Sequence, residues 1–414
     1  MVQTKVKSEL IDGGLGTDWQ SAIKTSNFTA EAGKGYFVDT TSNEITVSLP
    51  AGVVGKEIIF QDYAGTFDTN KIIFDSNSSE KIQGSTDNYK CIIENARINL
   101  VYQNATKGWT ADNIVTNVIP SPSISFIVVA GGGGAANGGG GAGGYRTGTL
   151  TASLATNYTV TVGAGSAGAD QGSGHAAKGS DSVFNTITSN GGGGGVKQYD
   201  GLTTNMSGGS GAGGGGYPTT RKGSGNTPST TPSQGNDGGG GAYGANYSGG
   251  GGGGAGGAGT AGSGTTPGNG GVGATTTIIS TSESSTYSVG EVSGGAVYFA
   301  GGGAGGSKND TNTPAYTAGT GGLGGGGDTA ASVGNVGQAG AANTGGGGGG
   351  PAFVGYGSSS LLGGAGGSGT VIIRYPSTNT VSNPGGGLTG NLNITSGSEK
   401  ISIFTAGTGS IQIN

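Results

Sequence analysis

Side chains that could carry out catalysis are few in this chain and lie far apart in its sequence. Its 414 residues include one histidine, His175, and one cysteine, Cys91. A zinc site needs several clustered nitrogen or sulfur ligands, and a Ser-His pair needs a nucleophile motif around the serine; the sequence has neither. The carboxylates Asp170, Asp181 and Asp200 are too scattered to predict a glycosidase pair. We therefore predict a protein that is not an enzyme, with no catalytic residue, no metal and no cofactor.

Phosphate-binding loops are not predicted either, although Gly-x-Gly-x-x-Gly matches occur many times by accident. Such a loop binds phosphate only when it ends in Lys-Ser/Thr or joins a strand to a helix, and neither setting occurs in this sequence. The chain has 18 basic and 23 acidic residues and a net charge of −5. This balance provides no positive field for a phosphate backbone, so we predict no nucleic-acid partner.

Binding is better represented, because tyrosines recur in the polar segments of the glycine-rich region. Tyrosine offers a rigid apolar ring and a hydroxyl group at a low cost in side-chain entropy, which suits recognition loops and sugar stacking. Alternatively, these rings lie over the ends of a glycine scaffold and cap it. Arg221 and Lys222 add a small basic pair, for which an ordinary solvated loop is an equal alternative. The candidate receptor-binding residues are Tyr199, Tyr217, Arg221, Lys222, Tyr243, Tyr247, Tyr287, Tyr316 and Tyr356.

The elements that must position these residues are dominated by glycine, which accounts for 101 residues. Most of the glycines lie between Pro120 and Pro376, in blocks separated by other segments. Ordering one glycine costs roughly 1–2 kcal/mol of backbone entropy and buries no side chain. Such a region either stays disordered or is held by contacts between backbones. Collagen is excluded because the blocks break its three-residue period.

We predict the ordered alternative, a bundle of polyglycine-II helices. Only 10% of the residues are charged, whereas disordered chains usually carry a high density of charge. A polyglycine-II helix has no internal hydrogen bonds, so its N–H and C=O groups can bond to neighbouring helices where no Cβ keeps the backbones apart. The polar inserts then form loops at the ends of the bundle. The alanines within the blocks are expected to face outward: Ala142, Ala212, Ala255, Ala258, Ala304 and Ala365.

The remaining segments indicate strands, so the predicted fold class is all-β plus glycine-rich. Short alternating segments over residues 17–115 are typical of a small β-sandwich or barrel. Two apolar segments, 124–130 and 370–375, bracket the glycine-rich region, and we predict that they pair. The predicted parts are an N-terminal arm over 1–16, an all-β attachment domain over 17–115, a linker over 116–123, the glycine-rich domain over 124–376, and a C-terminal β-hairpin segment over 377–414 with its turn at 407–409.

Two sets of landmarks resemble bacteriophage modules. The first set resembles a glycine-rich domain common in phage structural proteins and comprises residues 126–134, 143–146, 158–165, 179–184 and 369–376. The second set resembles another phage module and comprises residues 18–20, 35–41, 47–50 and 62–67. The resemblance implies a tail-fibre, appendage or head-decoration protein, most similar to those of marine or cyanobacterial phages. It also implies a likeness to polyglycine-helix adhesins, whose end loops grip the host receptor.

The expected function is therefore that of a non-enzymatic virion protein, a fibre or receptor-binding appendage for host-surface attachment. Capsid decoration, or a disordered spacer, is the alternative. Expected partners are other virion proteins, reached through the N-terminal region, and a host cell-surface glycan or protein. Phage fibres are commonly trimers, so we expect a homo-oligomer. The N-terminus lacks the apolar core of a signal peptide and no apolar run of about 18 residues could span a membrane. We therefore expect a virion protein made in the host cytoplasm.

Overall fold

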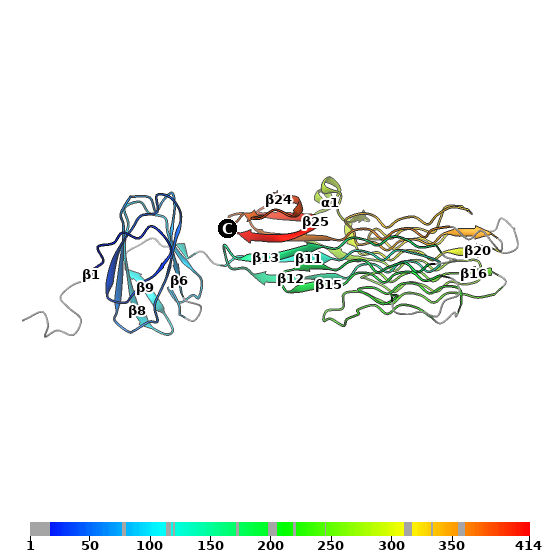
Figure 1. Cartoon of the computed structure of the whole chain (residues 1–414), viewed down its shortest axis with the longest axis horizontal. Helices are drawn as coiled ribbons and strands as arrows, with labels where there is room; N and C mark the ends of the chain where they lie inside the picture. Colours follow the sequence, from blue (N-terminus) through cyan, green and yellow to red (C-terminus); the bar gives the residue numbers. More distant parts are fainter. Residues whose placement is uncertain are drawn as a thin grey trace, which may run out of the picture. The chain divides into compact units, whose positions relative to one another are not determined.

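The computed structural model of the chain divides into two compact units, unit 1 over residues 1–121 and unit 2 over residues 122–414. Strands predominate in both units (Figure 1), so the all-β prediction is confirmed. The predicted arm over 1–16 lies outside the described residues. The structure describes residues 17–76, 80–112, 117–118, 121–170, 174–197, 205–217, 221–244, 246–309, 317–332, 334–354 and 361–414.

Unit 1 is a sandwich of two five-stranded sheets, ordered β1-β3-β5-β8-β9 and β10-β7-β6-β4-β2. The chain alternates between the sheets from β1 to β6, so β1, β3 and β5 pair in parallel, and so do β2, β4 and β6. The sequence predicted a sandwich or barrel but not this parallel winding. The strands are β1 (Asp18–Trp19), β2 (Phe28–Thr29), β3 (Lys34–Val38), β4 (Ile45–Ser48), β5 (Glu57–Asp62), β6 (Ile72–Asp75), β7 (Tyr89–Cys91), β8 (Arg97–Asn104), β9 (Gly108–Asp112) and β10 (Asn117–Val118).

Side chains from both sheets fill the core of unit 1. Alternate residues of β4 and β8 are buried, as expected where one face of a strand meets a core. The rings of Phe60 on β5 and Phe74 on β6 lie 4.8 Å apart between the sheets. Cys91 is buried in the same core, and this burial raises the pKa of its thiol. Unit 1 is therefore held by side-chain packing.

The turn after β5 is built around one buried carboxylate, that of Asp62. Four backbone N–H groups donate to it, from Gly65 (3.0 Å), Thr66 (3.2 Å), Phe67 (3.1 Å) and Asn95 (3.0 Å). A buried carboxylate is tolerated only when such hydrogen bonds replace its water. Asp62 thereby joins the turn that follows β5 to the segment that precedes β8.

Unit 2 begins with a nine-stranded antiparallel sheet, whose main path is β12-β11-β22-β25-β13-β14-β15; β23 and β24 also pair with β25. The predicted pairing of the two bracketing strands is confirmed, because Ser125–Val129 of β11 faces Arg374–Thr370 of β22. The strands are β11 (Ser123–Val129), β12 (Tyr145–Thr151), β13 (Asn157–Val162), β14 (Ser182–Phe184), β15 (Ile187–Ser189), β22 (Thr370–Pro376), β23 (Val381–Ser382), β24 (Leu388–Ser396) and β25 (Glu399–Ile413).

Both faces of the central strands β11 and β22 are covered. Phe126 and Val128 belong to one hydrophobic cluster, whereas Ile127 and Val129 belong to a second cluster on the opposite face. Strands buried on both faces appear in a sequence as continuous apolar runs. This explains why the two bracketing segments show no polar alternation.

The predicted turn at residues 407–409 is wrong, because these residues lie within the single 15-residue strand β25. The hairpin turns instead between β24 and β25, where Gly397 has a φ of +62°. A Cβ at Gly407 would lie within 3.0 Å of the Gly387 carbonyl group. These glycines therefore permit a close approach of β24 and β25 and do not reverse the chain.

From the sheet, extended glycine segments run side by side toward the far end of unit 2 (Figure 1). Their backbone groups bond to segments distant in sequence. Gly140 N–H donates to the Gly348 carbonyl (2.9 Å), while its own carbonyl accepts from Gly303 N–H (3.0 Å). The Gly303 carbonyl accepts in turn from Gly252 N–H (2.8 Å), and the Gly252 carbonyl from Gly271 N–H (2.8 Å). These glycine segments are therefore ordered by their backbones, and the disordered spacer is not what the structure contains.

The close spacing of these segments leaves no room for side chains. A Cβ at Gly140 would lie within 3.0 Å of the carbonyl group of Gly133, and one at Gly303 within 3.0 Å of that of Gly348. Real Cβ atoms essentially never come so close to other atoms. We call these side-by-side glycine segments the glycine array. The glycine array requires glycine at these interior positions because the backbones approach closely, not because of a left-handed φ.

The expectation that block alanines face outward holds for only some of them. Ala258 and Ala365 are exposed, but Ala142, Ala212 and Ala304 are buried. Ala142 lies in the hydrophobic cluster under the nine-stranded sheet, and Ala212 packs with two other apolar side chains. A methyl group is thus accepted at some buried positions of unit 2 and not at others.

A buried glutamine closes the seam between the two outer strands of the sheet, β12 and β15. The Gln234 carbonyl accepts from Tyr145 N–H (2.9 Å), where β12 begins. Its side-chain Oε1 accepts from Asn190 N–H (2.9 Å), directly after β15, and its Nε2 donates to Asn190 Oδ1 (3.0 Å) and to the Pro228 carbonyl (2.9 Å). Gln234 thereby gives the exposed sheet edges partners of their own.

A small three-stranded sheet, ordered β17-β19-β18, and one helix cover the second hydrophobic cluster. These elements are β17 (Ala274–Thr276), β18 (Glu291–Ser293), β19 (Ala296–Phe299) and α1 (Thr281–Tyr287). Arg374 on β22 ties this insert to the sheet: its Nε donates to the Ile278 carbonyl (2.7 Å), and its guanidinium lies 3.2 Å from Glu399 and 3.8 Å from Glu283.

Candidate functional site

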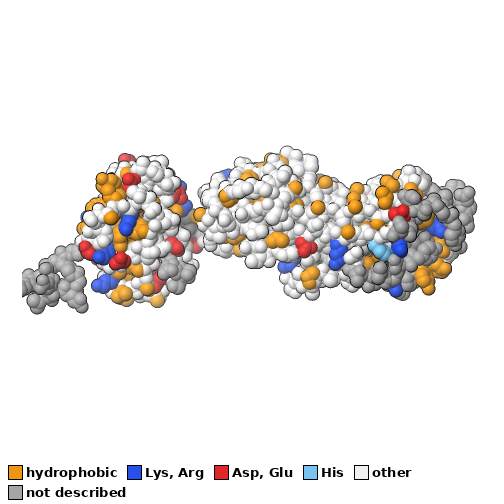
Figure 2. Space-filling model, viewed as in Figure 1, with side chains coloured by type: hydrophobic (Ala, Val, Ile, Leu, Met, Phe, Trp, Pro, Cys, Tyr) orange, Lys and Arg blue, Asp and Glu red, His pale blue; other side chains and the backbone are white. Residues whose placement is uncertain are grey.

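Unit 2 has one end that lies away from the nine-stranded sheet, and some of the polar inserts are found there (Figure 1). We call this end the tip and define it by Tyr217, Tyr243 and the three-stranded sheet β16-β20-β21. Figure 2 shows basic, acidic and hydrophobic side chains interspersed toward this end on the visible face. The strands of the tip are β16 (Asn246–Ser248), β20 (Ser307–Asn309) and β21 (Ala352–Val354).

Three predicted site residues, Tyr217, Tyr243 and Tyr247, meet at the tip and form what we call the tyrosine cluster. The ring centroids of Tyr217 and Tyr243 are 4.9 Å apart, and those of Tyr243 and Tyr247 are 5.2 Å apart in an edge-to-face arrangement. Both geometries are favourable for aromatic pairs. Tyr217 is 52% exposed and Tyr243 55%, whereas Tyr247 is only 5% exposed. One anchored ring therefore supports two rings that face solvent.

The backbone fixes the positions of these rings. Gly216 N–H, directly before Tyr217, donates to Oδ1 of the buried Asn137 (3.1 Å). Ala242 and Ser248 exchange two backbone hydrogen bonds of 2.8 and 3.2 Å, which close the loop that carries Tyr243 and Tyr247. The glycine segments thus end in tied loops, and the tied loops present the aromatic side chains.

Lys308 lies beside the most buried tyrosine. It pairs with Tyr247 across β16 and β20, and with Phe353 across β20 and β21. Its ammonium nitrogen lies 4.9 Å from the Tyr247 ring centroid, within the range of a cation–π interaction. Lys308 is only 4% exposed. Sequence reasoning missed this residue, because only the strand register brings it to Tyr247.

The predicted basic pair does not form an isolated positive patch. Lys222 lies 3.2 Å from Asp237, and both side chains are about half exposed. The Gly225 N–H, with Lys222 as a smaller contributor, holds the pKa of Asp237 below its usual value. Exposed ion pairs of this kind contribute only about 0–1 kcal/mol to stability. Arg221, the neighbouring residue, is half-buried.

Of the other predicted tyrosines, Tyr287 is described by the structure and lies apart from the tyrosine cluster. Tyr287 lies in α1 and packs against the hydrophobic cluster beneath the nine-stranded sheet. Tyr199, Tyr316 and Tyr356 lie outside the described residues. The structure therefore brings together three of the predicted tyrosines and assigns Tyr287 a packing contact elsewhere.

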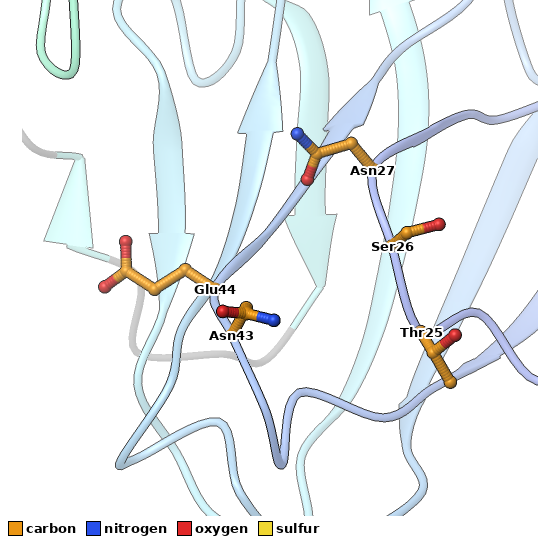
Figure 3. A pocket seen from close by; sticks show the side chains of 5 residues that line it. All are labelled: Thr25, Ser26, Asn27, Asn43 and Glu44. Carbon is orange, nitrogen blue, oxygen red and sulfur yellow. The ribbon is translucent and has the colours of Figure 1, made fainter.

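Unit 1 carries a hollow of about 400 Å³ (Figure 3). Two of its groups already serve the fold: Asn27 Oδ1 accepts from Thr46 N–H (2.8 Å), and Glu44 pairs with Lys71 (3.0 Å). The side chains that line it, all of them exposed, are those of Thr25, Ser26, Asn27, Asn43 and Glu44. Open polar surface whose groups are already paired has little of the enclosed, apolar character of a ligand pocket.

Comparison with known proteins defines the class first. Residues 14–114 match the family model described as bacteriophage T4 gp9/10-like protein, N-terminal. Together with the all-β fold and a second match, to a glycine-rich domain, this match supports a phage structural protein. Residues 110–376, more than half of the chain, match the model of the glycine-rich domain. The chain therefore belongs to the glycine-rich domain family. No curated protein matches it.

Two further findings concern the residues that the structure describes. No cluster of three or more histidine, cysteine, aspartate or glutamate side chains among them could hold a metal ion. No helix in the same part of the chain combines the length and the apolar character needed to cross a bilayer.

Proposed function

We propose that this phage structural protein is a fibre or receptor-binding appendage that presents the tip of unit 2 to the host surface. The observation that carries the proposal is the tyrosine cluster, in which two half-exposed rings are held by loops tied to the glycine segments. Tyrosines are enriched at recognition surfaces, where the ring packs and the hydroxyl group finds a hydrogen-bond partner. Their fixed positions reduce the entropy that binding would otherwise remove.

The glycine segments serve this function as a rigid scaffold, which we assign to packed polyglycine-II helices. Two observations support the assignment. Most glycines of the blocks keep φ outside the range from +20° to +160°, with Gly324, Gly325 and Gly345 as exceptions, and their N–H and C=O groups bond to different neighbouring segments. An experimental structure with φ near −75° in these segments agrees with the assignment, whereas values near −140°, as in antiparallel β-strands, reject it.

We further propose that unit 1 binds other virion proteins. We also propose that the whole chain forms a homo-oligomer, with a trimer as the expected form. The match of residues 14–114 to a phage N-terminal domain supports the first proposal. The oligomer is tested by the mass of the purified full chain in solution, for which a monomer at micromolar concentration is the contrary result.

The attachment function is tested by competition. Purified full-length protein is added to bacteria that the phage infects, and the rate of phage adsorption is measured. A receptor-binding appendage occupies the receptor and slows adsorption in proportion to the sites filled. If the protein only decorates the capsid, the adsorption rate is expected to stay constant at every concentration of added protein. That result would contradict the proposed attachment function.

A further inference from the structure

The exposed part of the tyrosine cluster has a definite chemical character. It belongs to the half-exposed side chains of Tyr217 and Tyr243, each an aromatic ring with a phenol hydroxyl group. Lys308, whose ammonium nitrogen lies 4.9 Å from the Tyr247 ring centroid, is only 4% exposed and adds little to this exposed surface. The surface therefore combines flat apolar faces with neutral hydrogen-bonding groups.

The two exposed rings of Tyr217 and Tyr243 also have a defined arrangement relative to each other. Their centroids are 4.9 Å apart and their planes meet at 54°, so the rings form an open angle and not a flat stack. The third ring, Tyr247, supports Tyr243 edge to face. A ligand at this angle meets one ring with a face and the other with an edge or a hydroxyl group.

Size favours a small ligand over a protein. One aromatic side chain buries about 150–250 Å² when fully covered, and these two are only half exposed. A stable protein interface buries about 800 Å² on each partner, which is several times more than the two rings offer. One or two sugar rings, with apolar C–H faces and neutral hydroxyl groups at their edges, match both the extent and the chemistry of the surface.

We infer that the pair Tyr217 and Tyr243 binds a neutral saccharide of the host surface. The inference rests on the proposed attachment function, of which it names the ligand class. Sugar C–H groups pack on the ring faces, and the phenol groups exchange hydrogen bonds with sugar hydroxyls. The rings supply most of the binding and the phenol groups a smaller part.

The test uses the full-length protein, a panel of immobilised uncharged bacterial oligosaccharides and intact host cells. The variants are Tyr217→Ala and Tyr243→Ala, with Tyr217→Phe and Tyr243→Phe to keep the rings. Tyr63→Ala is the matched control, because Tyr63 is 57% exposed but lies in unit 1. We expect saccharide binding to weaken roughly tenfold or more in each alanine variant, to change by less than about threefold in the phenylalanine variants, and to remain unchanged in Tyr63→Ala.

Treatment of the cells separates the possible ligands. Periodate, which cleaves sugar rings, is expected to abolish binding of the protein to cells, whereas surface proteolysis is expected to leave it intact. If proteolysis abolishes binding and periodate does not, a protein receptor replaces the saccharide and the attachment function stands. If the protein binds panel saccharides through the two tyrosines but not host cells, the saccharide site stands and the attachment function falls. If it binds neither, both are overturned.

Discussion

Unit 1 and the glycine array of unit 2 are both ordered, but different parts of the residue hold them together. In unit 1, buried rings such as Phe60 and Phe74 meet between two sheets, and the backbone bonds stay within each sheet. In the array, Gly140 and Gly303 bring no side chain, and their backbones bond directly across segments. The same small substitution therefore has opposite consequences in the two regions. A core of side chains tolerates exchanges of similar volume, whereas interior positions of the array such as Gly140 and Gly303 have no space for even one methyl group.

The comparison also explains the placement of the tyrosine cluster. A glycine array cannot display side chains from its interior, so side chains gather at its ends, where segments turn. Tyr217 follows such a segment directly, and Tyr243 and Tyr247 lie in a closed loop between two others. The glycine array therefore supports the loops, and the loops carry the side chains that could bind a ligand.

The strongest test of this contrast is Gly140→Ala. The new Cβ would lie within 3.0 Å of the Gly133 carbonyl group, which is backbone and cannot move aside cheaply. We expect overpacking and broken hydrogen bonds to destabilise unit 2 by about 3 kcal/mol or more. Thermal unfolding of the full chain, followed by calorimetry, measures the effect.

Gly174→Ala is the matched control, because the nearest atoms to its Cβ would lie at 3.4 Å or more, an ordinary contact. Since alanine restricts the unfolded chain, we expect Gly174→Ala to leave stability unchanged or to raise it by up to about 1 kcal/mol. Equal effects of the two substitutions would show that backbone proximity does not hold the array.

Both regions also contain side chains that fix the backbone, and the larger expected effect is that of Asp62 in unit 1. There a side chain fixes the backbone, because its carboxylate accepts four N–H groups. We expect Asp62→Ala to destabilise unit 1 by about 3 kcal/mol, since buried donors lose a charged acceptor. The control is Asp39→Ala: Asp39 accepts from Thr41 at an exposed turn, where water replaces it, and the expected loss is below about 1 kcal/mol. Chemical denaturation measures both, and similar losses would contradict the importance of burial.

A corresponding side chain in unit 2 is Gln234, which lies among glycine segments and bonds to residues at both outer strands of the sheet. We expect Gln234→Leu to destabilise unit 2 by about 2 kcal/mol, because it leaves the Asn190 N–H and the Pro228 carbonyl without this partner. Amide hydrogen exchange should quicken at Asn190 and Tyr145 while residues of unit 1 keep their protection. Unchanged exchange at Asn190 would mean that the seam is held by other contacts.

The sequence was most informative where a residue pattern is compatible with a single local structure. The apolar runs of β11 and β22, next to glycine, predicted their pairing correctly. It was less informative where one pattern fits two structures. Glycines at 407–409 resemble a turn but serve close approach within β25, and residues 182–187 resemble one strand but form the hairpin of β14 and β15, with Asn185 at a φ of +54°.

The candidate site shows the same limit. Tyrosines at loop positions were identifiable from their recurrence, so Tyr217, Tyr243 and Tyr247 were predicted. Their contact with one another depends on which segments lie side by side, and Lys308 reaches Tyr247 only through the register of β16 and β20. No local periodicity encodes such long-range register, because glycine blocks carry no side-chain pattern.

The smallest expected effect concerns the ionic contact of α1 with the sheet. Burial opposes ionisation of Glu283, but hydrogen bonds from Ser396 and Ser280, with Arg374 beside them, outweigh it and lower the pKa of this carboxyl. Its usual value is 4.5. The folded state therefore binds fewer protons than the unfolded state, so this contribution is complete above about pH 4.5 and is lost as the pH falls through the lower folded value.

We expect Glu283→Gln to remove this part of the pH dependence and to cost about 1 kcal/mol at pH 7, the size of one hydrogen bond. Melting of unit 2 at pH 7 and at successive steps below pH 4.5 measures it. The two proteins should converge in stability toward acid, because protonated glutamate is nearly isosteric with glutamine. A constant difference across this range would show that the charge of Glu283 does not stabilise α1 on the sheet, and that apolar packing and the bond from Arg374 to the Ile278 carbonyl hold this insert.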